Sequence, residues 1–244
     1  MNNKWVRTGD MKTARRGHAA TLLRDGRVLI TGGYDGTNAT SALNKAETYD
    51  PATGVWTNTT GTLVQARRWH TSTLLNNDKV LITGGGVSSG VSRVVELFDP
   101  VAGTFTATGS LALPRQGHTA TLLPNGTQVL VVGRNNADNT FSGGVDSSRT
   151  TELYDISAGT WSAGPVMTYG RDSHTATLIG SSNVLLVSGG YGAGTNKVET
   201  LDLTAGTLAW TTSSPMSVSR ALHTSTYIPS TDKVLVIGGY NATS

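Results

Sequence analysis

Five histidines are the side chains best suited to bind a metal ion or transfer a proton, and all occupy one repeated position. Each lies three residues after an arginine, and they are His18, His70, His118, His174 and His223. Imidazoles brought close together could bind a metal ion or an anion. A hydrogen bond repeated between neighbouring units is the simpler interpretation, because a catalytic site rarely has five equivalent members. We therefore expect structural histidines and predict neither a metal site nor a cofactor.

The arginines that precede these histidines recur with the same period as a set of glutamates. The arginines are Arg15, Arg67, Arg115, Arg171 and Arg220, and the glutamates are Glu47, Glu96, Glu152 and Glu199. An acid and a base could exchange protons with a substrate, but charges repeated in every unit favour structural ion pairs. A buried guanidinium that donates to a carboxylate satisfies both groups. We predict such pairs and no catalytic residue among them.

One segment matches a catalytic pattern in its letters only. Residues 86–90 read G-V-S-S-G and fit the nucleophile pattern G-x-S-x-G. That pattern requires a strand-to-helix elbow, whereas here it lies in a glycine- and serine-rich loop, so we do not expect a nucleophile. The chain also has no cysteine, which excludes thiolate metal ligands and thiol nucleophiles within it.

Charge and hydropathy exclude two classes of partner. The formal net charge is +3, and no run of lysine or arginine could follow a phosphate backbone, so we do not expect nucleic acid binding. No stretch of 18 apolar residues is present, so no membrane span is expected. Residues 1–11 lack the apolar core of a secretory signal. The bias toward Thr, Gly and Asn is consistent with a secreted or cell-surface protein of a bacterium, and nothing in the sequence indicates an oligomeric state.

The elements that must position these residues follow from a repeat of about 50 residues. Successive units begin at the five arginines, at separations of 52, 48, 56 and 49 residues. Each unit contains four short segments bounded by turn residues, such as Asp25-Gly26 and Asn125-Gly126, and each segment is too short for a helix. The repeat predicts an all-β propeller in which each unit forms one four-stranded antiparallel blade.

The second segment of each unit is apolar on both faces, as expected for a strand that packs between neighbouring sheets. These segments are Val28–Thr31, Val80–Thr83, Val129–Val132, Val184–Ser188 and Val234–Ile237. The third segment ends in an acidic and aromatic pair, as in Tyr49-Asp50 and Tyr154-Asp155. The fourth carries a large aromatic residue, which we expect to fill the wide outer gap between blades: Trp56, Phe105, Trp161 or Trp210.

We predict a single propeller domain over residues 1–244. Its parts are a segment 4–14, repeats 15–66, 67–114, 115–170 and 171–219, and a partial repeat 220–244. Trp5, Met11 and Arg15 have the same spacing as Trp161, Met167 and Arg171, so we expect residues 4–14 to form the fourth strand of a further blade. Pairing this strand with the last blade would close the ring and remove exposed sheet edges. Because the third strand of that blade is missing, a five-bladed ring and a fragment of a larger propeller are both open interpretations.

The repeated motifs resemble those of the kelch family. A Gly-Gly pair follows the second strand, and two aromatic residues then recur with six residues between them; the aromatic pairs are Tyr49 with Trp56, Phe98 with Phe105 and Tyr154 with Trp161. The resemblance implies a kelch-type β-propeller of about five four-stranded blades. Residues 26–33 and 66–70 also resemble the central propeller of galactose oxidase. Those enzymes use copper and a cysteine-crosslinked tyrosine, so the absence of cysteine excludes that chemistry in this chain.

The loops between the second and third strands vary most among the units, and variable loops on a fixed framework often carry binding residues. In an antiparallel blade they share one face with the loops that lead from the fourth strand to the next blade; we call it the loop face. The longest such loop begins at Arg134, which replaces the second glycine of the Gly-Gly pair. Our candidate ligand-binding patch on this face is Tyr34, Asp35, Arg134, Asn135, Asn136, Asp138, Phe141 and Tyr191. Neutral drift in a solvated loop is the alternative explanation.

Three functions fit these observations. We favour a non-enzymatic recognition scaffold that binds a protein or a glycan through the loop face. A carbohydrate-active propeller, whether a hydrolase, lyase or epimerase, is the enzymatic alternative, with its site over the central channel. A purely structural surface module is the third, and the sequence does not separate it from the first.

Overall fold

A computed structural model describes residues 4–36, 41–133, 147–193 and 195–241, and these residues form β-strands with one short 3-10 helix. The first blade contains β1 (Ala19–Leu22), β2 (Val28–Thr31), β3 (Ala46–Asp50) and β4 (Val55–Asn58). The second contains β5 (Thr71–Leu74), β6 (Val80–Thr83), β9 (Val95–Asp99) and β10 (Thr104–Ala107), with a hairpin of β7 (Gly86–Val87) and β8 (Gly90–Val91). The third contains β11 (Thr119–Leu122), β12 (Gln128–Val132), β13 (Thr151–Asp155) and β14 (Thr160–Ala163), with the 3-10 helix at Ser147–Arg149. The fourth contains β15 (Thr175–Ile179), β16 (Val184–Ser188), β17 (Val198–Asp202) and β18 (Trp210–Ser213), and β19 (Thr224–Ile228) and β20 (Lys233–Ile237) follow.

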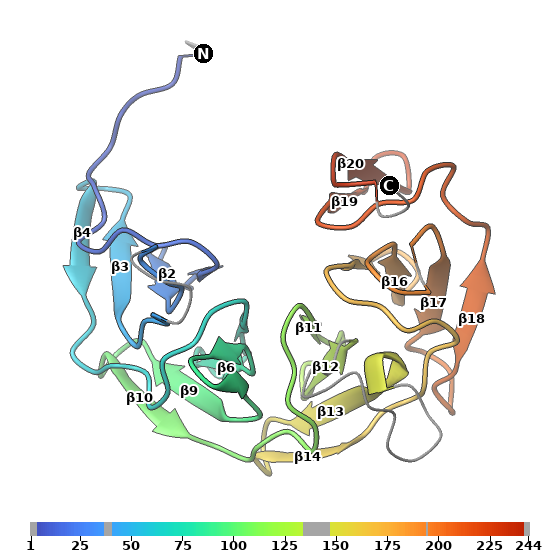
Figure 1. Ribbon diagram of the computed structural model, residues 1–244, viewed down its shortest axis with the longest axis horizontal. Coiled ribbons are helices and arrows are strands. Elements are labelled where there is room, and N and C mark those ends of the chain that lie inside the picture. The colour runs from blue at the N-terminus through green and yellow to red at the C-terminus, as the bar shows by residue number, and fades with distance from the viewer. Residues whose placement is uncertain (1–3, 37–40, 134–146, 194, 242–244) are drawn as a thin grey trace.

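The blades follow one another along an open arc (Figure 1). Four sheets have four antiparallel strands in the order first, second, third and fourth, and β19 and β20 form a fifth, two-stranded sheet. Neighbouring blades contact each other through their first strands, in the series β1, β5, β11, β15 and β19. The predicted all-β architecture of four-stranded antiparallel blades is therefore confirmed.

The second strand of each complete blade forms the centre of the core. Val80, Leu81 and Ile82 of β6 are all 0% exposed, so both faces of this strand are covered. One face of β6 packs with residues of the first blade, such as Leu29, in one apolar cluster. Its other face packs with residues of the third blade, such as Val129, in another. Burial on both faces explains why these segments have no polar alternation.

The recurrent aromatic residues are cross-strand partners on the outer half of each blade. Tyr49 of β3 lies opposite Trp56 of β4, with ring centroids 4.9 Å apart. Phe98 and Phe105 have the same relation in the second blade, and so do Tyr154 and Trp161 in the third. In the fourth blade Leu201 lies opposite Trp210. The spacing of six intervening residues therefore corresponds to a hairpin whose two aromatic side chains face one another.

The expectation of a strand within residues 4–14 is wrong. These residues contain no strand; Lys4–Arg7 extend away from the arc (Figure 1), and Trp5 is fully exposed. The fourth strand of a blade bonds to the third strand of the same blade, and the described residues offer this segment no such partner. Residues farther along do reach the first blade, because the Gly9 carbonyl accepts a 2.9 Å hydrogen bond from Trp56 Nε1. The predicted pairing with the last blade is not formed, and the arc is open between β1 and β19.

The described residues include no helix that is both long and apolar enough to cross a membrane.

Candidate functional site

The recurrent arginines and glutamates form buried ion pairs. Arg171 Nη2 donates to Glu199 Oε2 at 2.7 Å, and both side chains are fully buried. Arg171 Nη1 also donates to the Gly189 carbonyl at 2.9 Å, and Glu199 accepts the backbone N–H of Thr168 at 2.7 Å. The equivalent pairs are Arg15 with Glu47 at 2.6 Å, Arg67 with Glu96 at 2.5 Å and Arg115 with Glu152 at 3.0 Å. Each pair joins the start of a blade to its second and third strands.

Burial and ion pairing shift the pKa of the buried arginines in opposite directions. Loss of solvent lowers the pKa of Arg67, Arg115 and Arg171, while the facing glutamate raises it. Every paired glutamate also accepts backbone N–H groups of the segment that precedes its arginine, as Glu47 accepts those of Lys12 and Thr13. The carboxylate oxygens are thus committed to the framework, which leaves them poorly placed to act as general acids or bases.

Four of the five histidines form hydrogen bonds to the preceding blade through Nε2. The partners are Thr31 for His70 at 2.8 Å, Thr71 for His118 at 3.0 Å, Thr119 for His174 at 3.1 Å and Thr175 for His223 at 3.0 Å. Burial lowers the pKa of His118 to about 3, and the charge of Arg115 contributes to this decrease. The pKa values of His70 and His174 also lie well below the usual value, mainly because of burial. His18, in the first blade, is exposed.

A different group of residues, which we call the arginine–aromatic cluster, lies where the first two blades meet on the loop face. It consists of Arg16, Tyr34, Arg68 and Trp69. The Arg16 guanidinium lies 4.3 Å from the centroid of the Tyr34 ring, and the Arg68 guanidinium lies 4.6 Å from that of Trp69. The two aromatic rings meet edge to face at 6.0 Å. Cations and aromatic faces therefore alternate across the boundary between the blades.

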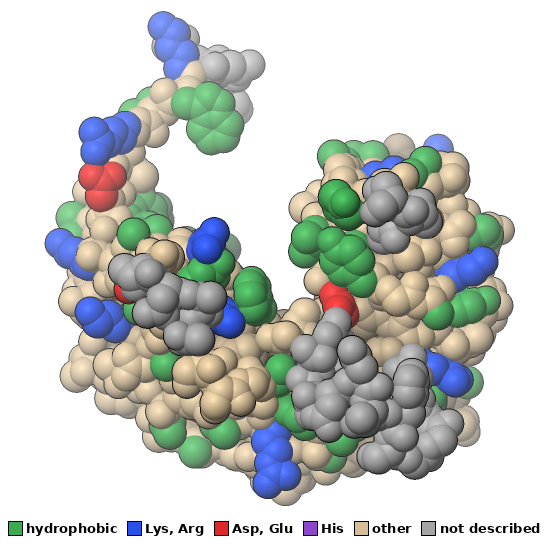
Figure 2. All heavy atoms as spheres, in the orientation of Figure 1, with side chains coloured by type: hydrophobic (Ala, Val, Ile, Leu, Met, Phe, Trp, Pro, Cys, Tyr) green, Lys and Arg blue, Asp and Glu red, His purple; other side chains and the backbone are tan. Residues whose placement is uncertain are grey.

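The local fold holds the cluster in place. Arg16 and Tyr34 exchange backbone hydrogen bonds of 3.0 and 2.9 Å, and the Trp69 N–H donates to the Gly17 carbonyl at 2.8 Å. Two loops of the first blade and one loop of the second thus supply its members. In Figure 2, basic and hydrophobic side chains lie side by side at the inner edge of the left arm of the arc, which is formed by the first blades in Figure 1.

Trp69 combines exposure with an unfavourable backbone. Its side chain is 46% exposed, and its φ is 52°, in the left-handed region. The equivalent residues, which directly precede the other histidines, are Gly17, Gly117, Ser173 and Leu222, all with positive φ. Only glycine adopts this conformation without cost, and other residues lose roughly 1–2 kcal/mol there. A large aromatic side chain kept exposed at a strained position is a candidate for ligand contact.

The described residues of the predicted ligand-binding patch lie in two blades that are not neighbours. Tyr34 belongs to the arginine–aromatic cluster, and Asp35 lies next to it and is exposed. Tyr191 occupies the position equivalent to Tyr34 in the fourth blade, where it forms a β-bridge with Asp172. The two tyrosines therefore belong to different sides of the arc. The other predicted residues lie outside the described part of the chain: Arg134, Asn135, Asn136, Asp138 and Phe141.

Sequence reasoning did not select Arg16, Arg68 or Trp69, because all three lie inside a motif interpreted as structural framework. The sequence does mark one of these residues as unusual. The residue before the histidine is glycine in the first and third units but Trp69 in the second. A bulky residue at a glycine position of a repeat indicates a local departure from the framework, in the same way as Arg134.

The remaining motif, G-x-S-x-G, lies in a β-hairpin. The G-x-S-x-G segment forms the hairpin of β7 and β8, with Gly86 opposite Val91, and the next element is the strand β9 rather than a helix. No group of three or more His, Cys, Asp or Glu side chains that could hold a metal ion is found within the described residues.

Two comparisons place the chain among known proteins. The family model described as "Attractin/LZTR1 beta-propeller" matches residues 2–199. A solved structure titled "Structure of YjhT" is similar in fold, with a TM-score of 0.73 and 16% sequence identity, over 93% of this chain and 78% of that one. No curated protein matches the chain. The expected kelch-type propeller fold is thereby confirmed, and the chain belongs to the Attractin/LZTR1 β-propeller family.

Proposed function

We propose that this protein is a non-enzymatic recognition scaffold that binds a protein or a glycan through the loop face of one propeller domain spanning residues 1–244. The observation that carries the proposal is the arginine–aromatic cluster at the boundary of the first two blades. Trp, Tyr and Arg are the residues enriched at energetically dominant positions of interfaces. Here all three types meet on the surface, at a place where the first and third units have glycine.

The chemistry of the cluster supports both ligand classes. The exposed Trp69 ring offers an apolar face to a sugar ring or to an aromatic or aliphatic side chain. The guanidinium groups of Arg16 and Arg68 are already stacked on aromatic rings, so little side-chain entropy is lost when they bind an acceptor. Asp35, which follows Tyr34 in the sequence, is exposed.

Two features support a non-enzymatic role over a carbohydrate-active enzyme. The four glutamates of the third strands are committed to arginine and backbone donors, as Glu199 is to Arg171 and Thr168. The buried histidines are held neutral and bonded to neighbouring blades, as His118 is to Thr71. Acid–base chemistry would need such groups within reach of a bound substrate.

The test compares wild-type protein with Trp69→Gly and Arg68→Ala on a glycan array and in a displayed peptide library. Ser173→Gly is the matched control, because it makes the same kind of change at the equivalent position of the fourth blade. We expect selective binding that weakens by roughly 30-fold or more in the cluster variants, the effect of removing a residue worth about 2 kcal/mol. Binding in the control is expected to be unchanged.

Equal binding by wild type and Trp69→Gly would place the ligand elsewhere and overturn the proposal. Absence of binding to both libraries by a folded sample would also contradict it and favour a structural role. Each bound glycan is then incubated with the protein and examined by mass spectrometry. Cleavage, elimination or epimerisation of that glycan would favour the enzymatic alternative.

A further inference from the structure

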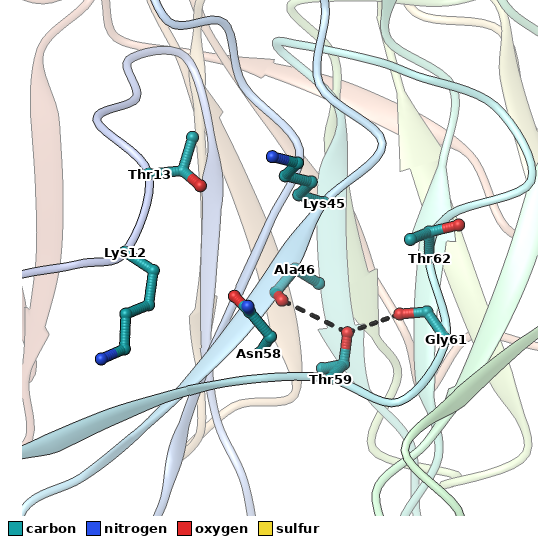
Figure 3. A pocket seen from close by; sticks show the side chains of 8 residues that line it. All are labelled: Lys12, Thr13, Lys45, Ala46, Asn58, Thr59, Gly61 and Thr62. Carbon is teal, nitrogen blue, oxygen red and sulfur yellow. Dashed lines mark hydrogen bonds between the residues drawn. The ribbon is translucent and has the colours of Figure 1, made fainter.

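A pocket of about 320 Å³, separate from the arginine–aromatic cluster, lies on the first blade. Its lining comes from the segment before Arg15, the start of β3 and the end of β4: Lys12, Thr13, Lys45, Ala46, Asn58, Thr59, Gly61 and Thr62. Figure 3 shows Thr13 and Lys45 pointing toward one another across the pocket, with Asn58 and Thr59 below them and Lys12 along one side. The volume is at the lower end of the range for small-molecule sites, about 300–1,000 Å³.

The repeat supplies an internal comparison for this pocket. Lys12 donates its backbone N–H to Glu47, and Val64 of the second blade donates in the same way to Glu96. Lys12 and Val64 are therefore equivalent, and the third and fourth blades have Ala112 and Thr168 there. This position carries a positive charge in the first blade and not in the other three complete blades.

The counterparts of Lys45 and Asn58 in the second blade follow from the same kind of comparison. The carbonyl of Lys45 accepts a hydrogen bond from Arg15, and that of Val94 accepts one from Arg67. Asn58 lies opposite Glu47 on β4, whereas Ala107 lies opposite Glu96 on β10. The second blade thus has Val64, Val94 and Ala107 where the first has Lys12, Lys45 and Asn58. The shared framework tolerates apolar residues at all three positions, so folding does not require the polar set.

The charges in this pocket are not neutralised by its surroundings. Neither lysine forms an ion pair with any carboxylate in the described parts of the chain. The nearby carboxylate of Glu47 is buried against Arg15 and two backbone N–H groups. The Thr59 hydroxyl donates to the backbone carbonyls of Ala46 and Gly61, which also line the pocket. The lining therefore offers two ammonium groups and the Asn58 amide as donors, with no acidic side chain among its members.

We propose that this pocket binds a small oxyanion, in the form of a sulfate or phosphate ester. Ammonium groups are compact charges that serve a tetrahedral anion from several directions, whereas a planar carboxylate is matched better by the fork of an arginine. The Lys45 ammonium and the Thr13 hydroxyl flank the anion from opposite sides of the pocket. The Lys12 ammonium, which is directed away from these two groups in Figure 3, swings toward the anion on its flexible stem and adds a second charge. The Asn58 amide donates a further hydrogen bond. This site does not depend on the cluster at the loop face.

The experiment measures binding of glucose 6-phosphate, inorganic phosphate, inorganic sulfate and uncharged glucose by calorimetry at low ionic strength. The test variant is Lys12→Val, Lys45→Val and Asn58→Ala combined, which installs the residues of the second blade. Because that blade folds with these residues, the variant is expected to fold. The matched control is Lys4→Ala with Lys233→Ala, which removes the same charge at exposed positions outside the pocket.

We expect saturable binding of the oxyanions and none of glucose. The triple variant should raise Kd at least about tenfold, because charge-assisted hydrogen bonds are the strong ones, while the charge control and Trp69→Gly should bind like wild type. Tighter binding of glucose 6-phosphate than of the inorganic ions would support an ester as the ligand, and equal binding would support a free ion. Equal weakening in the charge control, no weakening in the triple variant, or no saturable binding by wild type would each overturn the proposal.

Discussion

His118 Nε2 lies 3.0 Å from the hydroxyl of Thr71, which belongs to the first strand of the preceding blade. The same bond joins His174 to Thr119 and His223 to Thr175. These bonds link each blade to its neighbour at the innermost strands, where the blades contact one another directly. The histidines therefore link consecutive blades to each other.

Acidification should destabilise the protein through these buried imidazoles. A histidine in the unfolded chain has a pKa of about 6.5, and burial lowers the pKa of His118 to about 3 in the folded protein. The folded state thus favours the neutral form. The contribution of neutral His118 to the free energy of unfolding is fully present above about pH 6.5. As the pH decreases from there toward 3, this contribution falls by about 1.4 kcal/mol per pH unit. Chemical denaturation at several pH values between 7.5 and 5 measures this slope.

His118→Gln provides the control for this prediction, since an amide can still hydrogen-bond Thr71 but does not titrate. Its free energy of unfolding should decrease less steeply on acidification, by about 1.4 kcal/mol per pH unit. A slope identical to that of wild type would show that His118 does not carry the pH dependence.

Removal of one member of a buried ion pair should be costly. Arg171→Leu leaves the Glu199 carboxylate without its charged partner in a fully buried position, and such a change typically costs about 3–5 kcal/mol. Arg27→Ala is the comparison, because Arg27 pairs with Asp25 at the surface and exposed pairs contribute about 0–1 kcal/mol. Denaturant titration followed by circular dichroism measures both changes. Similar losses in the two variants would contradict the framework role assigned to Arg171.

Trp69→Gly should remove ligand contact without a corresponding loss of stability. A non-glycine residue in the left-handed conformation loses roughly 1–2 kcal/mol of stability, and glycine at this position removes that strain. The removal of strain offsets the loss of packing against Tyr34 and Arg68. We expect the free energy of unfolding to stay within about 1 kcal/mol of wild type or to rise. Leu222→Gly removes the same backbone strain at the equivalent position of the last sheet. A large destabilisation by Trp69→Gly alone would assign the ring a structural role.

Ser88 should be chemically inert despite the G-x-S-x-G pattern. It lies in the tight turn between β7 and β8, without the strand-to-helix geometry that exposes a serine nucleophile. A fluorophosphonate probe is expected to leave the protein unlabelled, as judged by intact mass. Labelling that disappears in Ser88→Ala would establish a nucleophile in this hairpin and reopen the enzymatic alternative.

The recurrent framework could be predicted from the sequence to a large extent. The second strand expected at Val80–Thr83 is observed with the same bounds as β6, because an apolar run between turns is a local signal. The sequence showed the recurrent spacing of Tyr49 and Trp56, and the structure shows that the two residues are cross-strand partners. The expected strand near Trp5 did not form, since a strand requires a partner that spacing alone does not reveal. The loop beginning at Arg134 lies outside the described residues, so the prediction for it stays a prediction.

The sequence by itself determined the repeat, the strand order within each blade and the apolar second strands. These depend on turns and on hydrophobic patterns within about 50 residues, which every unit contains. Only the tertiary structure decided which loops meet: it brings Tyr34 and Trp69 together from adjacent blades and places Lys12, Lys45 and Asn58 around one pocket. The physical reason is that contacts between blades and side-chain packing depend on the three-dimensional arrangement of distant segments, which no local pattern encodes.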